Sequence, residues 1–81
     1  MNGQIIWNKT EVIPAKKASN GWVYEMSYIA RRTISLFTAD FYGKGERTYV
    51  TDSRYRNGQI LAVSSQYPLE TAPEWIQELA S

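Results

Sequence analysis

Hydrophobic and polar residues alternate along most of the chain, and this period of two predicts β-strands. The stretches 4–7 and 10–13 are rich in β-branched and aromatic residues, which strands prefer, and they fit either one bent strand or two short ones. Pro14 is expected to end this region because it has no backbone N–H for a ladder. The loop that follows ends at Asn20-Gly21, a pair that accepts the positive φ of a tight turn.

Residues 22–42 fit two different interpretations. As an extended chain, Trp22, Tyr24, Met26 and Tyr28 share one face, which we expect to be buried, and a second strand runs over 33–42 after a break at Arg31-Arg32. Apolar residues in the same region also recur at steps of three and four, which fits one helix over about residues 23–42. We favour two strands because Trp, Val, Tyr, Ile, Thr and Phe all lose side-chain freedom in a helix.

The strongest local signal is Asn57-Gly58 between two extended runs, 47–56 and 59–65. This pair is typical of a two-residue hairpin turn, because both central residues of a type I′ turn need positive φ. Such a turn places Tyr55 opposite Ile60, Arg54 opposite Leu61 and Ser53 opposite Ala62. Neither face of this hairpin is wholly apolar, which indicates either a bulge or a curled sheet.

The C-terminus predicts a helix of about nine residues, with Thr71 as N-cap, Glu74 as its capping-box partner and Pro73 in the first turn. Trp75, Ile76 and Leu79 form its apolar face. A helix this short is marginal alone, so we expect it to dock on the sheet, chiefly through Trp75. The predicted fold class is α+β: a single domain, 1–81, with an antiparallel meander of four or five strands, flat or curled, and one C-terminal helix packed on it.

Composition supports one folded domain, and the apolar segments of the chain indicate its cellular location. The chain has 81 residues, of which 43% are hydrophobic and 21% charged, far from the composition of disordered chains. No apolar stretch reaches the roughly 20 residues that cross a bilayer, and the N-terminus lacks the pattern of a secretory signal. We therefore expect a cytoplasmic protein without a membrane partner.

The sequence contains no cysteine and no histidine. This absence removes disulfides, thiolate nucleophiles, the usual zinc ligands and the side chain that most often transfers protons near neutral pH. Asp40, Glu46 and Asp52 are the remaining candidates for a carboxylate pair, and nothing in the sequence brings two of them into a pocket. Gly43-Lys44-Gly45 fits a hairpin turn better than a phosphate-binding loop. We expect no enzymatic activity, no metal and no small-molecule cofactor.

Charge is distributed unevenly around a formal net value of +1. Residues 31–56 hold six basic and three acidic groups, whereas residues 57–81 hold three Glu and no basic residue. Cations interleaved with aromatic rings are typical of sheets that bind nucleic acid, because the cations meet phosphates and the rings stack on bases. The candidate binding residues are Arg31, Arg32, Lys44, Arg47, Arg54, Tyr55 and Arg56.

Two functions compete with the simple interpretation of these residues as solvated surface. The first is a small non-catalytic module that binds another protein, for example as a regulator or inhibitor, since Tyr, Trp and Arg are enriched in binding hot spots. Self-association is a special case of this hypothesis. The second is nucleic-acid binding, which ranks lower because a pI near 8.0 is below the strongly basic balance that usually accompanies it.

Overall fold

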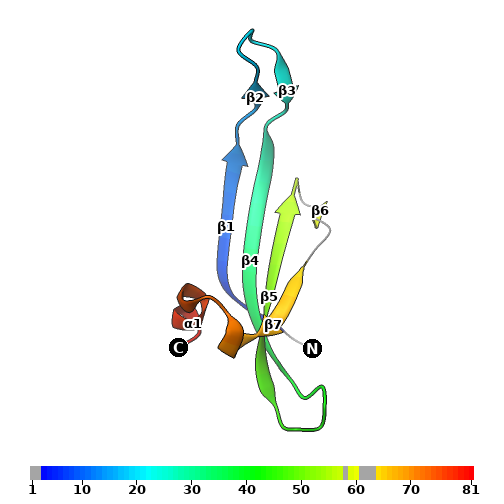
Figure 1. Ribbon diagram of the computed structural model, residues 1–81, viewed down its shortest axis with the longest axis vertical. Coiled ribbons are helices and arrows are strands. Elements are labelled where there is room, and N and C mark those ends of the chain that lie inside the picture. The colour runs from blue at the N-terminus through cyan, green and yellow to red at the C-terminus, as the bar shows by residue number, and fades with distance from the viewer. Residues whose placement is uncertain (1–2, 58, 61–63) are drawn as a thin grey trace.

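Figure 1 shows the computed structural model of the protein, which describes residues 3–57, 59–60 and 64–81. The fold is α+β, as predicted: an antiparallel sheet, a second small sheet and one C-terminal helix. The elements are β1 (Gln4–Ile13), β2 (Lys16–Lys17), β3 (Val23–Glu25), β4 (Tyr28–Ala39), β5 (Arg47–Arg56), β6 (Gln59–Ile60), β7 (Ser65–Pro68), the 3₁₀ helix η1 (Leu69–Thr71) and α1 (Glu74–Ala80).

Three long strands form the sheet in the order β1-β4-β5, and β6 and β7 both pair with β5. β2 and β3 pair with each other and extend the β1–β4 hairpin beyond the sheet (Figure 1). The molecule is therefore long and thin, with extents of 59 × 23 × 17 Å. Its radius of gyration is 16.9 Å, whereas a compact domain of this length has one of about 12 Å.

The strand interpretation of residues 22–42 is correct, but the predicted break is wrong. β4 runs through Arg31 and Arg32 without interruption, and the break falls at Met26-Ser27 instead. Pairing explains the difference, because Arg31 lies opposite Tyr55 and Arg32 opposite Arg54 in the β4–β5 ladder. The first region is one strand, with a register shift between Ile5 and Trp7.

The hairpin after β5 forms as predicted where the structure describes it. Asn57 has a φ of +51°, and Tyr55 lies opposite Ile60. The predicted partners Leu61 and Ala62 lie outside the described residues. β7 then pairs with β5 in a register shifted by two residues from that of β6, with Asp52 opposite Ser65.

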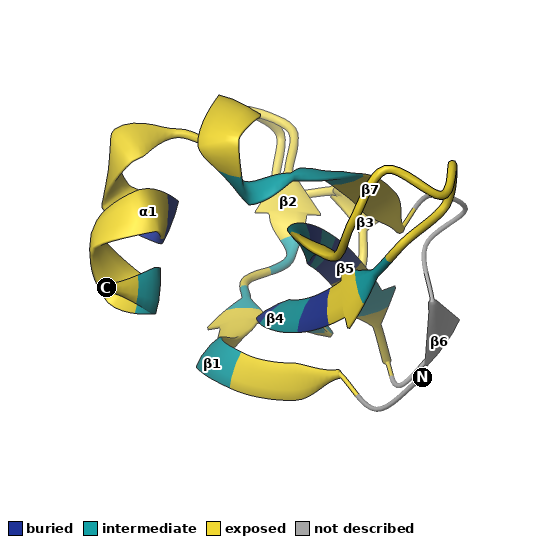
Figure 2. Cartoon of the chain, turned by 90° about the horizontal axis from the view of Figure 1, so that it is seen from below, coloured by how far each residue is buried: buried dark blue, intermediate teal, exposed yellow. Residues whose placement is uncertain are grey.

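The core lies at the end of the sheet covered by α1. Ile34, Val50 and Ile76 are fully buried, and Ala72 is nearly so. Viewed along the strands, β1 and β7 lie on either side of the β4–β5 pair, and α1 packs on one face of that pair (Figure 2). Burial of each large aliphatic side chain stabilises the fold by about 1.5–3 kcal/mol, and Ile76 is the side chain through which α1 joins the buried Ile34 of β4 and Val50 of β5.

Two details of the helix differ from the prediction. Thr71 does not cap α1: its hydroxyl donates a hydrogen bond to the Pro68 carbonyl, 2.8 Å away, and so closes η1, while α1 begins two residues later than expected, after Pro73. The helix docks chiefly through the fully buried Ile76, whereas Trp75 is 39% exposed and makes an edge contact with Trp7 of β1, with ring centres 5.4 Å apart. Neighbouring residues on a helix point about 100° apart, so Ile76 points into the core while Trp75 lies at its margin.

The predicted burial of the face that carries Trp22, Tyr24 and Met26 is also wrong. These residues are 73%, 65% and 73% exposed, and Tyr28 is half-buried. They belong to the two-stranded extension, against which no third strand or helix packs in the described part of the chain. Alternation identified the strand, but it did not reveal that no other described element packs against it.

Candidate functional site

An open hollow of about 610 Å³ lies between Trp7 and Trp75 at one end and Tyr28 at the other. We call it the basic hollow, because the charged side chains that line it are mostly cationic. They are Lys9, Arg31, Arg32 and Arg54, with Glu11 as the one acidic residue, and the remaining lining comes from Trp7, Tyr28, Ala30, Tyr55 and Trp75. Side chains from four elements therefore meet on the face of the sheet that carries α1, whereas Arg31 and Tyr55, which precede and follow Arg32 and Arg54 in the strands, point their side chains to the opposite face.

Sheet register explains why the cations gather there. Lys9 on β1 lies opposite Arg32 on β4, and Arg32 lies opposite Arg54 on β5, so three cations form one row across three strands. Like charges placed directly opposite each other destabilise a sheet. A row of this kind needs compensating anions, either from the chain itself or from a ligand.

Arg32 finds its anion within the chain. Its Nε and Nη2 donate hydrogen bonds to the two carboxylate oxygens of Asp52, at 2.9 and 2.7 Å. The guanidinium also lies 5.4 Å from the ring centre of Trp75 and 5.9 Å from that of Trp7. The hydrogen bonds to Asp52 raise the pKa of Arg32 further above its ordinary value, against the opposing effect of burial. Arg32 is therefore fixed in place and is a structural part of the site.

The other cations are held less tightly. Lys9 lies 4.0 Å from Glu11, and both side chains are more than half exposed, so this ion pair is weak. Arg56 stacks on the ring of Tyr28 at 4.0 Å. Arg54 has no salt-bridge partner among the described residues. Arg54 and Arg56 can therefore meet an anionic ligand without breaking an ion pair.

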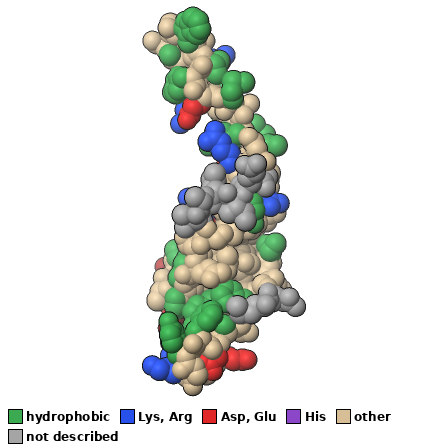
Figure 3. All heavy atoms as spheres, turned by 90° about the vertical axis from the view of Figure 1, so that its right-hand side faces the viewer, with side chains coloured by type: hydrophobic (Ala, Val, Ile, Leu, Met, Phe, Trp, Pro, Cys, Tyr) green, Lys and Arg blue, Asp and Glu red, His purple; other side chains and the backbone are tan. Residues whose placement is uncertain are grey.

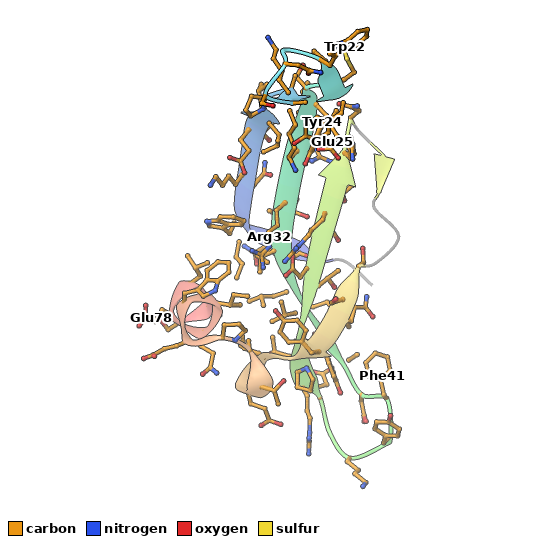
Figure 4. All side chains as sticks on the ribbon, turned by 45° about the horizontal axis from the view of Figure 1, so that its top comes forward. Trp22, Tyr24, Glu25, Arg32, Phe41 and Glu78 are labelled. Atoms are coloured by element: carbon orange, nitrogen blue, oxygen red, sulfur yellow. The ribbon has the colours of Figure 1, made fainter. Side chains whose placement is uncertain are left out.

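The structure divides the predicted residues near the end of β5 between the two faces of the sheet. Arg32 and Arg54 line the basic hollow with Arg56 beside it, whereas the guanidinium of Arg31 stacks on Tyr55 at 4.2 Å on the opposite face. Figure 4 shows Arg32 between the long hairpin extension and the loop that carries Phe41.

Lys44 and Arg47 do not belong to this group. Lys44 lies in the loop between β4 and β5, and Arg47 opens β5, seven residues before Arg54. That spacing is about 24 Å along an extended strand. Arg47 instead lies 3.8 Å from Glu70 of η1. The predicted set thus divides between the two ends of the sheet.

Sequence reasoning missed four residues of the site, namely Trp7, Lys9, Tyr28 and Trp75. Trp7 and Lys9 belong to β1, Tyr28 to β4 and Trp75 to α1, so none of them lies in the basic hairpin of β5 and β6. Only the β1–β4 register and the docking of α1 bring these residues to the hollow. The Lys-x-Glu alternation in β1 was the one signal that a charged row faced the same side as Trp7. Without the register, its partner strand could not be identified.

A second surface is the hairpin extension, which we call the arm and define as residues 12–29. It begins beyond the last β4–β5 pair, Ala30 with Arg56. Hydrophobic side chains cover the corresponding upper end of the molecule (Figure 3), and Trp22 and Tyr24 lie far from Glu78 on the helix (Figure 4). Six of the eleven exposed large hydrophobic residues in the described chain belong to the arm: Val12, Trp22, Val23, Tyr24, Met26 and Ile29.

Polar contacts give the arm a defined shape. Lys16 and Glu25 form an ion pair of 3.2 Å across β2 and β3, and the hydrogen bond to Glu25 raises the pKa of Lys16. At the tip, the Ala18 N–H donates to the Trp22 carbonyl, and the Asn20 side chain accepts a hydrogen bond from the Trp22 N–H. Gly21 has a φ of +86° there, as the predicted turn requires. Trp22 is thus presented by an ordered turn.

The three carboxylates considered for catalysis serve other contacts or stand apart. Asp40 accepts hydrogen bonds from the Lys44 and Gly45 N–H groups and so closes the β4–β5 loop, while Asp52 pairs with Arg32. Among residues 3–57, 59–60 and 64–81, no group of three or more Asp or Glu is placed to hold a metal ion. No helix in that part of the chain is both long and apolar enough to cross a membrane.

Comparison with known proteins identifies no relative: no family model, no curated protein and no solved structure matches this chain.

Proposed function

We propose that this protein is a small non-catalytic module that binds another protein through the arm. The observation that supports this proposal is the concentration of exposed hydrophobic side chains on a two-stranded ribbon that projects from the sheet. Exposed hydrophobic side chains gathered at one place on a surface are typical of protein interaction sites.

The physical argument is that the arm has little to stabilise it alone. A two-stranded hairpin is marginally stable in water, because it has no third layer against which to bury its side chains. Trp22, Tyr24 and Met26 leave most of their surface in water. A partner with an apolar groove would cover these side chains, and Trp and Tyr are the residue types that most often dominate the free energy of binding at such contacts.

The arm also offers backbone groups to a partner. In the described chain, β2 and β3 pair only with each other, so each has one open edge. A strand of the partner can add to such an edge, with backbone hydrogen bonds giving affinity and alternate side chains giving specificity. A regulator or inhibitor that inserts an arm into the cleft of its target would use both contributions.

The test is quantitative affinity capture from cells that produce the protein, with and without nuclease. The parent is compared with Trp22→Ser, Tyr24→Ser and a matched control, Tyr42→Ser, which changes an exposed aromatic residue at the opposite end of the molecule. We expect a partner that resists nuclease, is retained by the control and is lost in both arm variants. All four proteins should melt alike, because these side chains are exposed. Equal capture by the arm variants and the parent would contradict the proposal.

Binding of single-stranded nucleic acid at the basic hollow is the second candidate. It is supported by the juxtaposition of Arg54, which has no ion-pair partner in the described chain, with Arg56 and the half-buried Tyr28. Cations beside aromatic rings suit a backbone phosphate and its neighbouring base.

This candidate makes a different prediction for the same protein. Oligonucleotide titrations should give saturable binding, and Arg54→Ala with Arg56→Ala should flatten the dependence of log affinity on log salt by about two units, one per lost phosphate contact. Lys44→Ala is the matched control, since Lys44 lies at the other end of β4. Absence of saturable binding by the parent at physiological salt would eliminate this candidate and leave the arm proposal intact.

A further inference from the structure

β1 forms an open edge of the sheet. Its ten residues, Gln4–Ile13, pair with β4 on one side, and no described strand pairs with the other side (Figure 1). Such an edge presents unpaired N–H and C=O groups and is a template for another strand. Nothing in the described chain covers it with a helix, because α1 packs on the face of the sheet (Figure 2).

A second copy of the same chain can pair with this edge only in certain registers. A two-fold axis perpendicular to the sheet makes two identical strands antiparallel and gives both copies the same contacts. One residue of β1, the central residue, then faces the same residue of the second copy across the axis. A residue that precedes the central one by a given number of positions faces the residue that follows it by the same number in the other copy. The choice of central residue fixes every pair.

The charges of β1 distinguish these registers. Centring on Lys9 places Lys opposite Lys, and centring on Glu11 places Glu opposite Glu, both of which destabilise a sheet. Centring on Thr10 instead places Lys9 of each copy opposite Glu11 of the other. Both side chains are accessible, at 58% and 51% exposed. Centres at Asn8 or Val12 leave both charges without an opposite partner.

We propose that two copies of this chain associate by antiparallel pairing of their β1 strands centred on Thr10, which joins the two sheets into one. Trp7 of each copy then lies opposite Ile13 of the other, and Asn8 opposite Val12. Apolar pairs thus flank two ion pairs on the face that carries α1. The pattern is self-complementary, as an isologous interface requires.

The association also supports the weakest part of the fold. Val12 is 70% exposed, and beyond Glu11 the β1–β4 ribbon has no third strand in the described chain. In the proposed pair, residues 7 and 8 of the second copy lie beside residues 13 and 12 and supply that strand. The paired segment spans residues 7–13, so the tip of the arm stays exposed. This inference goes beyond the proposed function and uses the open edge of β1, which overlaps the arm only at residues 12 and 13 and leaves Trp22 and Tyr24 free, so either proposal can fail without the other.

Sedimentation of the parent and three charge variants tests the pairing. The parent should show a concentration-dependent monomer–dimer equilibrium between about 10 µM and 1 mM, the range expected for a small interface. Lys9→Glu and Glu11→Lys each turn both ion pairs into like-charge pairs and should weaken association about tenfold or more. The combined variant restores opposite charges in the same rows, so its dimer constant should return to within about threefold of the parent's. Circular dichroism confirms that each variant folds.

Disulfide trapping tests the register, because the chain has no cysteine of its own. Residues directly opposite in an antiparallel pair have Cα atoms about 4.5–5.5 Å apart, which a disulfide can bridge. Thr10→Cys should therefore form covalent dimers on mild oxidation. Asn8→Cys is the matched control on the same face of the same strand, and it should cross-link far more slowly because it faces Val12.

Three results would overturn the proposal: a parent that remains monomeric up to about 1 mM, a combined charge variant no tighter than the single variants, or equal cross-linking at the two cysteine positions. The capture experiment on the arm has its own variants, so its outcome is separate from these.

Discussion

Arg32 on β4 and Asp52 on β5 are joined by two parallel hydrogen bonds, at 2.9 and 2.7 Å, across the middle of the sheet. They are not directly opposite each other: Arg32 faces Arg54, and Asp52 faces Ile34. The contact is therefore diagonal and connects the charged half of this face to its apolar half. Asp52 is nearly buried, with 11% of its side chain exposed. A buried carboxylate destabilises a fold unless it is paired, so the negative charge of Asp52 depends on its hydrogen bonds to Arg32.

A double-mutant cycle should reveal this dependence. Arg32→Met leaves a carboxylate without its partner, and Asp52→Leu leaves three cations in a row, so each should destabilise the fold by roughly 2–4 kcal/mol. The double variant replaces the pair with apolar side chains and should cost less than the sum, with a coupling free energy of about 1.5–3 kcal/mol. Urea denaturation of the four proteins measures it. Additive costs would mean that the two side chains do not depend on each other.

Ile76 should be the residue through which α1 stabilises the fold. It is fully buried in the core cluster, so Ile76→Val should cost about 0.5–1.5 kcal/mol and Ile76→Ala about 2–5 kcal/mol. Trp75→Ala should cost less than Ile76→Ala, because Trp75 is partly exposed and loses mainly its edge contact with Trp7 at 5.4 Å. Glu78→Ala, on the exposed side of the helix, is the control. A larger loss for Trp75→Ala would assign the anchoring role to that ring instead.

The pKa of Tyr67 predicts how the stability of the fold changes at high pH. Burial, followed by the nearby negative charge of Asp52, raises the pKa of Tyr67 above its ordinary value of 10.0. A group whose pKa is raised by folding contributes stability that is complete below its unfolded pKa and is lost as pH rises through its folded pKa. Stability should therefore fall above pH 10.0.

The matched variant for this effect is Tyr67→Phe, which keeps the ring against the core and removes the ionisable group. The difference in melting temperature between parent and variant should be constant from about pH 6 to 9 and should shift in favour of the variant at higher pH. Other tyrosines and lysines titrate in both proteins and cancel in the comparison. A difference that stays constant at high pH would show that Tyr67 ionises without cost in the folded state.

Local chemistry made the turns and the strand type predictable from the sequence. Asn57 and Gly21 have the positive φ that their dipeptides suggested, and β-branched residues gave the correct choice of strand over helix in 23–42. Tyr55 also lies opposite Ile60, where a two-residue turn places it, and Arg54 lines the basic hollow.

The predictions that the structure contradicts depended on long-range packing. Trp22 and Tyr24 alternate as a buried face would, but burial needs a third layer, and no property of these residues reveals that none is present in the described chain. Similarly, Trp75 and Ile76 are both apolar, and only the direction of the short helix decides which one is fully buried. Lys9 reaches the site only through the β1–β4 register, which places it opposite Arg32 with 22 residues between them in the sequence, so no local signal connects the two.

Asn57 provides the last prediction, because it connects the end of β5 to the base of the arm. Its N–H donates to the Ile29 carbonyl at 2.8 Å, and its side-chain oxygen accepts a hydrogen bond from the Ile29 N–H at 2.9 Å. These two bonds extend the support of β4 one residue past the final ladder pair, Ala30 with Arg56. Asn57 does this in the left-handed region, with a φ of +51°, which asparagine tolerates better than most residues.

Two substitutions separate the backbone and side-chain contributions of Asn57. Asn57→Gly keeps the left-handed backbone but loses the acceptor for Ile29, so it should cost about 1 kcal/mol. Asn57→Ala loses the acceptor and also the tolerance of asparagine for the left-handed region, so it should cost about 2 kcal/mol. If the side chain holds the arm, hydrogen exchange at the Ile29 amide should quicken by roughly fivefold or more in Asn57→Gly, since 1.4 kcal/mol is tenfold. Amides of the Ile34–Val50 core should exchange as before, because those strands keep their own ladder. Equal acceleration in the core would mean that Asn57 contributes to global stability and does not act specifically on the arm.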